Sequence, residues 1–69
     1  MISAGMLLDR YDQVGQPMSM YYVVSVNGDE ATILDVKTGK VWPFSVGFME
    51  QLLKNPIGGS GNCAFRIAG

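Results

Sequence analysis

The sequence predicts a mostly β fold in a single domain that spans residues 1–69. Short runs of β-branched and aromatic residues alternate with Gly, Pro and Asn turn signals, and only one segment has helical spacing. A chain of 69 residues suffices for one domain and not for two. We therefore expect about five short antiparallel strands in a small barrel or curled sheet, with one short helix near residues 45–54. A single α+β sheet with the helix packed on one face is the alternative.

The first two strands flank a loop. Residues 5–11 begin with three consecutive apolar side chains and continue with alternating polarity, which favours a strand. Residues 12–17 contain Gly and Pro and predict a loop. Residues 19–26 form the clearest strand, because they are mostly aromatic or β-branched.

A hairpin follows directly. Asn27-Gly28 is the preferred centre of a two-residue type I′ turn, and residues 30–36 return as the next strand. With that turn, Val24 lies opposite Ala31, whereas a four-residue loop shifts the pairs but keeps the faces. The hairpin then places on one face the side chains of Tyr22, Val24, Val26, Ala31 and Ile33, with Tyr21, Val23 and Ser25 on the other face.

The second half predicts a turn, an edge strand, a helix and a last strand. Residues 37–40 form a tight turn in which Gly39 suits a left-handed conformation. Pro43 places the strand of residues 41–44 at a sheet edge, because proline donates no ladder hydrogen bond. Ser45 can cap a helix that ends before Asn55-Pro56, and its apolar stripe consists of Phe48, Met49, Leu52 and Leu53.

The C-terminal part consists of a glycine-rich link and a strand. Residues 58–61 read Gly-Gly-Ser-Gly and predict a linker or turn. Residues 63–68 alternate as a strand would, with Cys63, Phe65 and Ile67 on one side. This order of strands, with a helix between the fourth and the fifth, resembles the small SH3-like barrel, in which the loop of residues 12–17 would be the long loop.

The composition argues against a catalytic or metal-binding function. The chain has one cysteine and no histidine, so it can form neither an intrachain disulfide nor a zinc site of its own. Without histidine, nucleophile and acid–base sites lack their commonest base. We interpret Cys63 as a small buried hydrophobe rather than a reactive thiol. The sequence thus predicts no enzyme, no catalytic or metal-binding residue and no cofactor.

Location is predicted from what the chain lacks. The longest apolar run is far shorter than the ~20 residues of a membrane-spanning helix. Residues 1–5 have neither the basic region nor the long apolar segment of a signal peptide. A lone cysteine suits a reducing compartment, so we expect a cytoplasmic protein that does not enter membranes.

Apolar content predicts the function. Residues of the AVILMFWYC set make up 48% of the chain and charged residues only 16%, which leaves apolar surface for a partner. We therefore expect a protein-interaction module that forms homo-oligomers, and a virus- or mobile-element-encoded factor that binds a host or structural protein is one setting for it. The expected partner-binding residues are Tyr21, Trp42, Phe44, Phe48, Met49 and Leu52. A nucleic-acid-binding SH3-like barrel is the alternative, although five basic residues against six acidic ones weigh against it.

Overall fold

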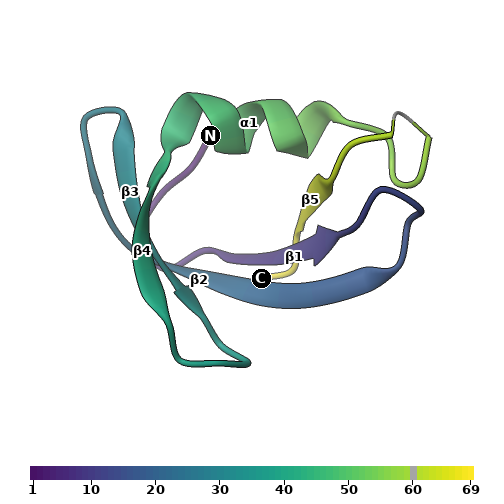
Figure 1. The fold of residues 1–69 in the computed structure, drawn as a ribbon. Coiled ribbons are helices and arrows are strands. Elements are labelled where there is room, and N and C mark those ends of the chain that lie inside the picture. Colours follow the sequence, from purple (N-terminus) through teal and green to yellow (C-terminus); the bar gives the residue numbers. More distant parts are fainter. Residues whose placement is uncertain (60) are drawn as a thin grey trace.

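The computed structural model describes residues 1–59 and 61–69. One antiparallel sheet has the strand order β4-β3-β2-β1-β5, and one helix precedes the last strand (Figure 1). The elements are β1 (Leu7–Tyr11), β2 (Pro17–Asn27), β3 (Glu30–Asp35), β4 (Val41–Ser45), α1 (Val46–Lys54) and β5 (Ala64–Ile67). The predicted fold class, with five antiparallel strands and a short helix near residues 45–54, is confirmed.

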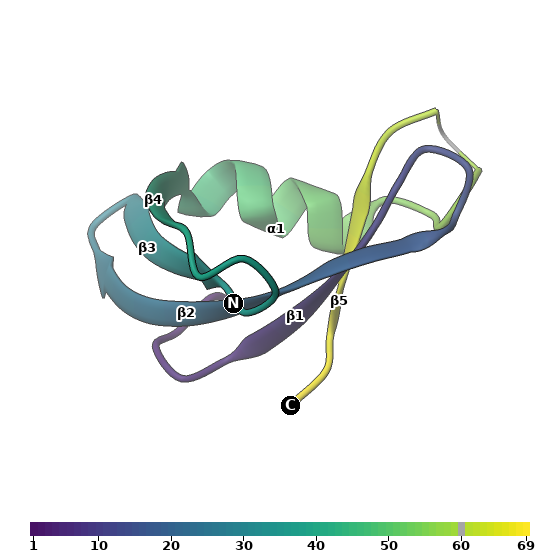
Figure 2. The same ribbon diagram turned by 60° about the horizontal axis from the view of Figure 1, so that its bottom comes forward.

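The sheet curls around its core, and α1 covers the open side. In Figures 1 and 2 the long strand β2 bends along the sheet, and α1 lies across the concave face. β4 and β5 are the two edge strands, and α1 packs against both of them. The helix therefore bridges the gap between the two ends of the sheet.

The register of the β2–β3 hairpin differs from the prediction. The turn is centred on Gly28 and Asp29 rather than on Asn27 and Gly28, because Asn27 already pairs with Glu30. Gly28 has a φ of +63°, and a positive φ at the first central residue is typical of a type II′ turn.

A bulge corrects the predicted faces of β2. The register shifts between Val23 and Ser25, so that Ile33 lies opposite Val23 instead of Tyr22. An extra residue in one strand reverses which side chains point inward on either side of it. Val23 and Tyr21 are therefore buried, while Tyr22 and Val24 point away from the core. The predicted face of Tyr22, Val24, Val26, Ala31 and Ile33 is wrong for its first two members.

The turn between β3 and β4 agrees with the prediction. Gly39 has a φ of +77°, and its N–H donates to the carbonyl of Asp35. Asp35 is 7% exposed, and its Oδ1 accepts from the N–H groups of Lys37 and Thr38 at 2.8 and 3.2 Å. Pro43 lies in β4 at the sheet edge, as expected.

Two side chains cap the N-terminus of α1. Ser45 is the N-cap residue predicted from the sequence, and its Oγ accepts from the N–H of Phe48 at 3.2 Å. Asp29, from the β2–β3 turn, accepts through Oδ1 from the N–H of Gly47 at 3.1 Å. The N–H of Val46 donates to the Asp29 carbonyl at 2.8 Å. The hairpin turn and the helix start are thus bound to each other.

The C-terminal end of α1 is bound to the last strand. Arg66 donates from Nη1 to the Leu53 carbonyl and from Nη2 to the Asn55 carbonyl, where a cation suits the helix dipole. Asn55 Nδ2 donates to the carbonyl of Cys63, which is half-buried. Of the predicted glycine-rich link, Ser60 lies outside the described residues.

The core lies between the concave face of the sheet and α1. Leu8, Val23, Ile33 and Met49 are fully enclosed, and Phe65 is 1% exposed. The remaining buried apolar residues of this cluster are Ile2, Tyr21, Ala31 and Leu52. The N-terminal segment before the first strand thus adds Ile2 to the core, which the strand pattern did not indicate.

Candidate protein-interaction surfaces

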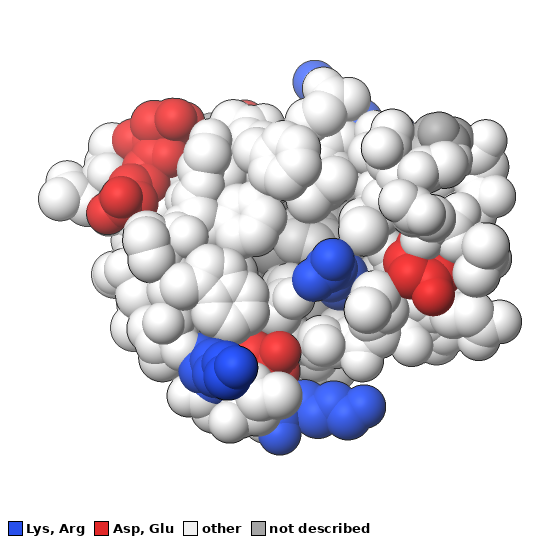
Figure 3. Space-filling model, in the orientation of Figure 1, with Lys and Arg blue, Asp and Glu red and all other residues white. Residues whose placement is uncertain are grey.

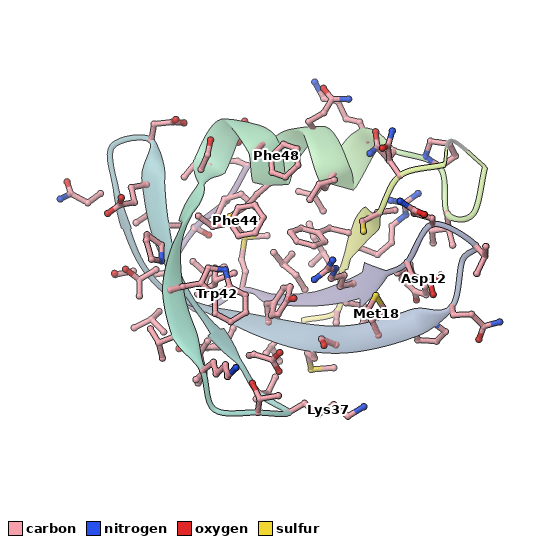
Figure 4. The ribbon with its side chains drawn as sticks, in the orientation of Figure 1. Asp12, Met18, Lys37, Trp42, Phe44 and Phe48 are labelled. Carbon is pink, nitrogen blue, oxygen red and sulfur yellow. The ribbon has the colours of Figure 1, made fainter. Side chains whose placement is uncertain are left out.

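Three of the six expected partner-binding residues line one side of the molecule. Trp42 and Phe44 lie on β4 and Phe48 on α1, and the three follow one another from the sheet edge up to the helix (Figure 4). Phe44 and Phe48 stack with ring centroids 5.6 Å apart and an interplanar angle of 10°. Trp42 meets Tyr21 edge-on at 5.6 Å. Phe65 contacts both Tyr21 and Phe44, with ring centroids 5.8 and 6.1 Å apart, and so joins the two pairs into one aromatic cluster that extends from the core to the surface.

The other three expected residues lie in the core. Tyr21 is 2%, Met49 0% and Leu52 5% exposed, so none of them offers a surface to a partner. Within the aromatic cluster, Phe48 is 55% exposed and Phe44 half-buried. The candidate surface on this side therefore narrows to Phe44, Phe48 and the half-buried Trp42.

A second apolar surface lies on the convex face of the sheet. Leu7 pairs with Tyr22, Tyr22 with Leu34, and Leu34 with Val41. Paired residues of antiparallel strands point to the same face, so these four side chains form one line across four strands. We call them the outer apolar row. Tyr22 is 37% and Val41 56% exposed, whereas Leu7 and Leu34 are half-buried.

Further apolar side chains flank the outer apolar row. Met20 and Val24 stand two residues from Tyr22 along β2, and Val36 donates its N–H to the Met20 carbonyl. All three are exposed. The sequence pattern did not indicate this surface, because the predicted register placed Tyr22 and Val24 on the same face as Ala31 and Ile33. Their alternation with Tyr21 and Val23 is a signal that could have found it, since both faces of β2 are apolar.

A pocket of about 390 Å³ opens beside the aromatic cluster, between α1, β4 and the start of β5. Its apolar walls come from Phe44, Phe48, Leu52 and Phe65. Polar side chains complete the lining, namely Arg10, Gln13, Gln51, Asn55, Asn62 and Cys63.

Among the described residues that line this pocket, Arg10 alone is charged. Its Nη1 donates to Tyr21 Oη at 2.8 Å, and its Nη2 donates to Cys63 Sγ at 3.5 Å. These hydrogen bonds, first to Cys63 and then to Tyr21, raise the pKa of the Arg10 guanidinium. The pocket therefore carries a permanent positive charge beside apolar walls.

Charged groups are sparse on this side of the molecule. Figure 3 shows the largest acidic patch at the end of the β2–β3 turn, smaller acidic patches on the right and near the bottom, one basic group near the middle and other basic groups at the top and bottom margins. A basic patch, which phosphate contacts require, is not seen on this face. Among residues 1–59 and 61–69, no group of three His, Cys, Asp or Glu side chains is placed to hold a metal ion.

No family model, no curated protein and no solved structure matches the chain. Within the described part of the chain, no helix is long and apolar enough to cross a membrane. The side chains of the described residues form two apolar surfaces suited to binding, and one of them contains a cation.

Proposed function

We propose that this chain is a non-enzymatic protein-interaction module that associates with a second copy of itself through the outer apolar row. The observation that carries the proposal is the line of Leu7, Tyr22, Leu34 and Val41 on a sheet face that α1 does not cover. The row itself contains no charged residue, and Asp9, which pairs with Met20 beside the row, lies at its border, so two copies that meet on the row need not bury a charge.

Strand composition supports association through this face. An antiparallel sheet with one solvated face normally alternates apolar residues inside with polar residues outside. β2 departs from this rule, because Tyr21 and Val23 fill the core while Met20, Tyr22 and Val24 face outward. A strand with two apolar faces is suited to lie between two layers, and this chain supplies only one.

The sheet edges favour face-to-face packing over edge pairing. Pro43 lies in the edge strand β4 and cannot donate a hydrogen bond to an added strand. α1 packs on β5, the other edge strand. The convex face is thus the more accessible route to a second copy.

We also propose that the domain is an SH3-like barrel. The sheet order β4-β3-β2-β1-β5 and the helix between the fourth and fifth strands support this resemblance. The likeness concerns the scaffold alone, and the functional proposal rests on the outer apolar row.

Light scattering after size exclusion, over a concentration series, tests the function. We expect the wild type to form dimers, and Tyr22→Lys to raise the concentration of half-dissociation at least about tenfold, because a buried unpaired charge is costly. Val14→Lys is the matched control, since Val14 is 74% exposed in the β1–β2 loop and outside the row. A wild type that stays monomeric, or equal weakening by both variants, would contradict the proposal.

A further inference from the structure

We propose that the pocket beside Arg10 binds a small carboxylic acid whose carboxylate is carried on an apolar, preferably aromatic, group. This site is separate from the outer apolar row, because its walls belong to the concave side of the sheet and to α1. The proposal does not depend on self-association.

The volume and the walls define the apolar part of the ligand. A pocket of about 390 Å³ is at the small end of the range for ligand sites. Phe44 and Phe48 present stacked rings at one wall, and Phe65 lies 6.1 Å from Phe44 between ring centroids. An aromatic or branched aliphatic group fits such walls through offset or edge contacts.

Arg10 defines the charged part of the ligand. A guanidinium has five N–H donors, and the hydrogen bonds to Tyr21 and Cys63 use two of them. Neither Asp nor Glu is found among the described residues that line the pocket. Asp12, the nearest acid after Arg10 in the sequence, directs its Oδ1 to the backbone N–H groups of Val14 and Gln16. Arg10 is therefore not neutralised within the pocket, and a carboxylate matches the guanidinium fork.

Tyr21 holds this cation in place. The Tyr21 ring is packed edge-on between Trp42 and Phe65, and its hydroxyl oxygen accepts from Arg10 at 2.8 Å. A guanidinium fixed by a buried ring loses less conformational entropy when it binds than a free surface arginine does.

Titration of the labelled protein, followed by amide NMR shifts, tests the proposal with 4-phenylbutanoate and its neutral amide as probes. We expect the acid to bind with a Kd on the order of 0.1–1 mM, as suits about twelve heavy atoms. The shifts should map to α1, the start of β5 and Arg10. The amide should bind at least about tenfold more weakly, since a charge-assisted hydrogen bond is lost.

Variants distinguish the contribution of the Arg10 charge from that of the apolar side chains that line the pocket. Arg10→Gln should weaken the acid about tenfold or more and leave the amide unchanged, whereas Lys54→Gln, which removes a charge from the exposed side of α1, should change neither. Phe48→Ala should weaken both probes without unfolding the chain, because Phe48 is 55% exposed. It therefore tests the site even if Arg10→Gln fails to fold.

Four results would overturn the proposal. Equal affinity for the acid and the amide would show that the charge of Arg10 does not contribute to binding. If the wild type does not bind the probe at millimolar concentration, or if the shifts are confined to the convex face, the pocket is not a binding site for such acids. Tighter binding of an N-acetylated peptide that ends in phenylalanine would assign the carboxylate to a polypeptide terminus instead of a small acid.

Discussion

Gly58 lies directly against the loop that joins β1 and β2. A Cβ atom at this position would stand 3.2 Å from the Gly15 Cα and 3.2 Å from the carbonyl of Val14. The backbone φ of Gly58 is +72°, a conformation that side chains disfavour. The glycine-rich segment was predicted to be a linker or turn, and Gly58 and Gly59 lie in a turn. The contact between this turn and the β1–β2 loop was not predicted.

Alanine at Gly58 should destabilise the fold more than alanine at Gly39. Gly39 has a similar φ of +77° but no atom within 4 Å of the added Cβ. We expect Gly39→Ala to lower the free energy of unfolding by about 1 kcal/mol, and Gly58→Ala by at least about twice as much, because the close contact adds strain. Urea unfolding of both variants measures the difference. Equal losses would mean that the contact between the loops contributes nothing.

At the scale of elements, α1 depends on groups from two parts of the chain. Ser45 comes from the helix's own N-terminus and Asp29 from the β2–β3 turn, and Ser45 Oγ donates to Asp29 Oδ2 at 3.4 Å. The Ser45 cap could be predicted from local sequence. The Asp29 contact joins residues 18 positions apart in sequence, so it depends on the hairpin and could not be predicted locally.

The two caps should be coupled. We expect Ser45→Ala and Asp29→Ala each to lower the free energy of unfolding by about 1 kcal/mol, because each leaves a helix N–H without its acceptor. The double variant should lose less than the sum, since the Ser45–Asp29 hydrogen bond is removed by either change. A thermodynamic cycle from urea unfolding provides the measurement, and full additivity would show that the two side chains act independently.

Neighbouring residues of α1 should differ sharply in their effect on stability. Met49 is fully buried and Phe48 is 55% exposed. We expect Met49→Ala to cost about 2–5 kcal/mol, as a cavity-forming core substitution does. Phe48→Ala should cost less than about 1.5 kcal/mol, chiefly the stacking with Phe44. Comparable losses in thermal or urea unfolding would contradict the assignment of Met49 to the core.

The β2–β3 hairpin shows which features could be predicted from the sequence and which could not. Strand existence, the edge position of Pro43 and the cap at Ser45 follow from local preferences, and all were confirmed. The face of Tyr22 depends on a bulge beside Val24, which tertiary packing decides. Because this bulge was not predicted, the predicted pairing of β2 with β3 was displaced by one residue, and the two faces of β2 were exchanged around Tyr22. Tyr21 was therefore expected among the partner-binding residues, and the outer apolar row was not predicted.

The whole molecule is as compact as its size predicts. Its accessible surface is 4070 Å², close to the roughly 4200 Å² that a monomer of this mass has on average. The exposed apolar side chains on the convex face are therefore not the result of an incomplete collapse. They form a surface that the fold leaves uncovered, which is the basis for proposing a second copy as its partner.

Isotope-filtered NMR on a mixture of labelled and unlabelled protein can detect self-association through the outer apolar row. Contacts between copies should connect Tyr22, Leu34 and Val41 on one chain with the same residues on the other, and they should weaken on dilution. The aromatic ring of Phe48, on the concave side, should show none. Intermolecular contacts from Phe48 with none from Tyr22, or no intermolecular contacts at all, would contradict self-association through the outer apolar row.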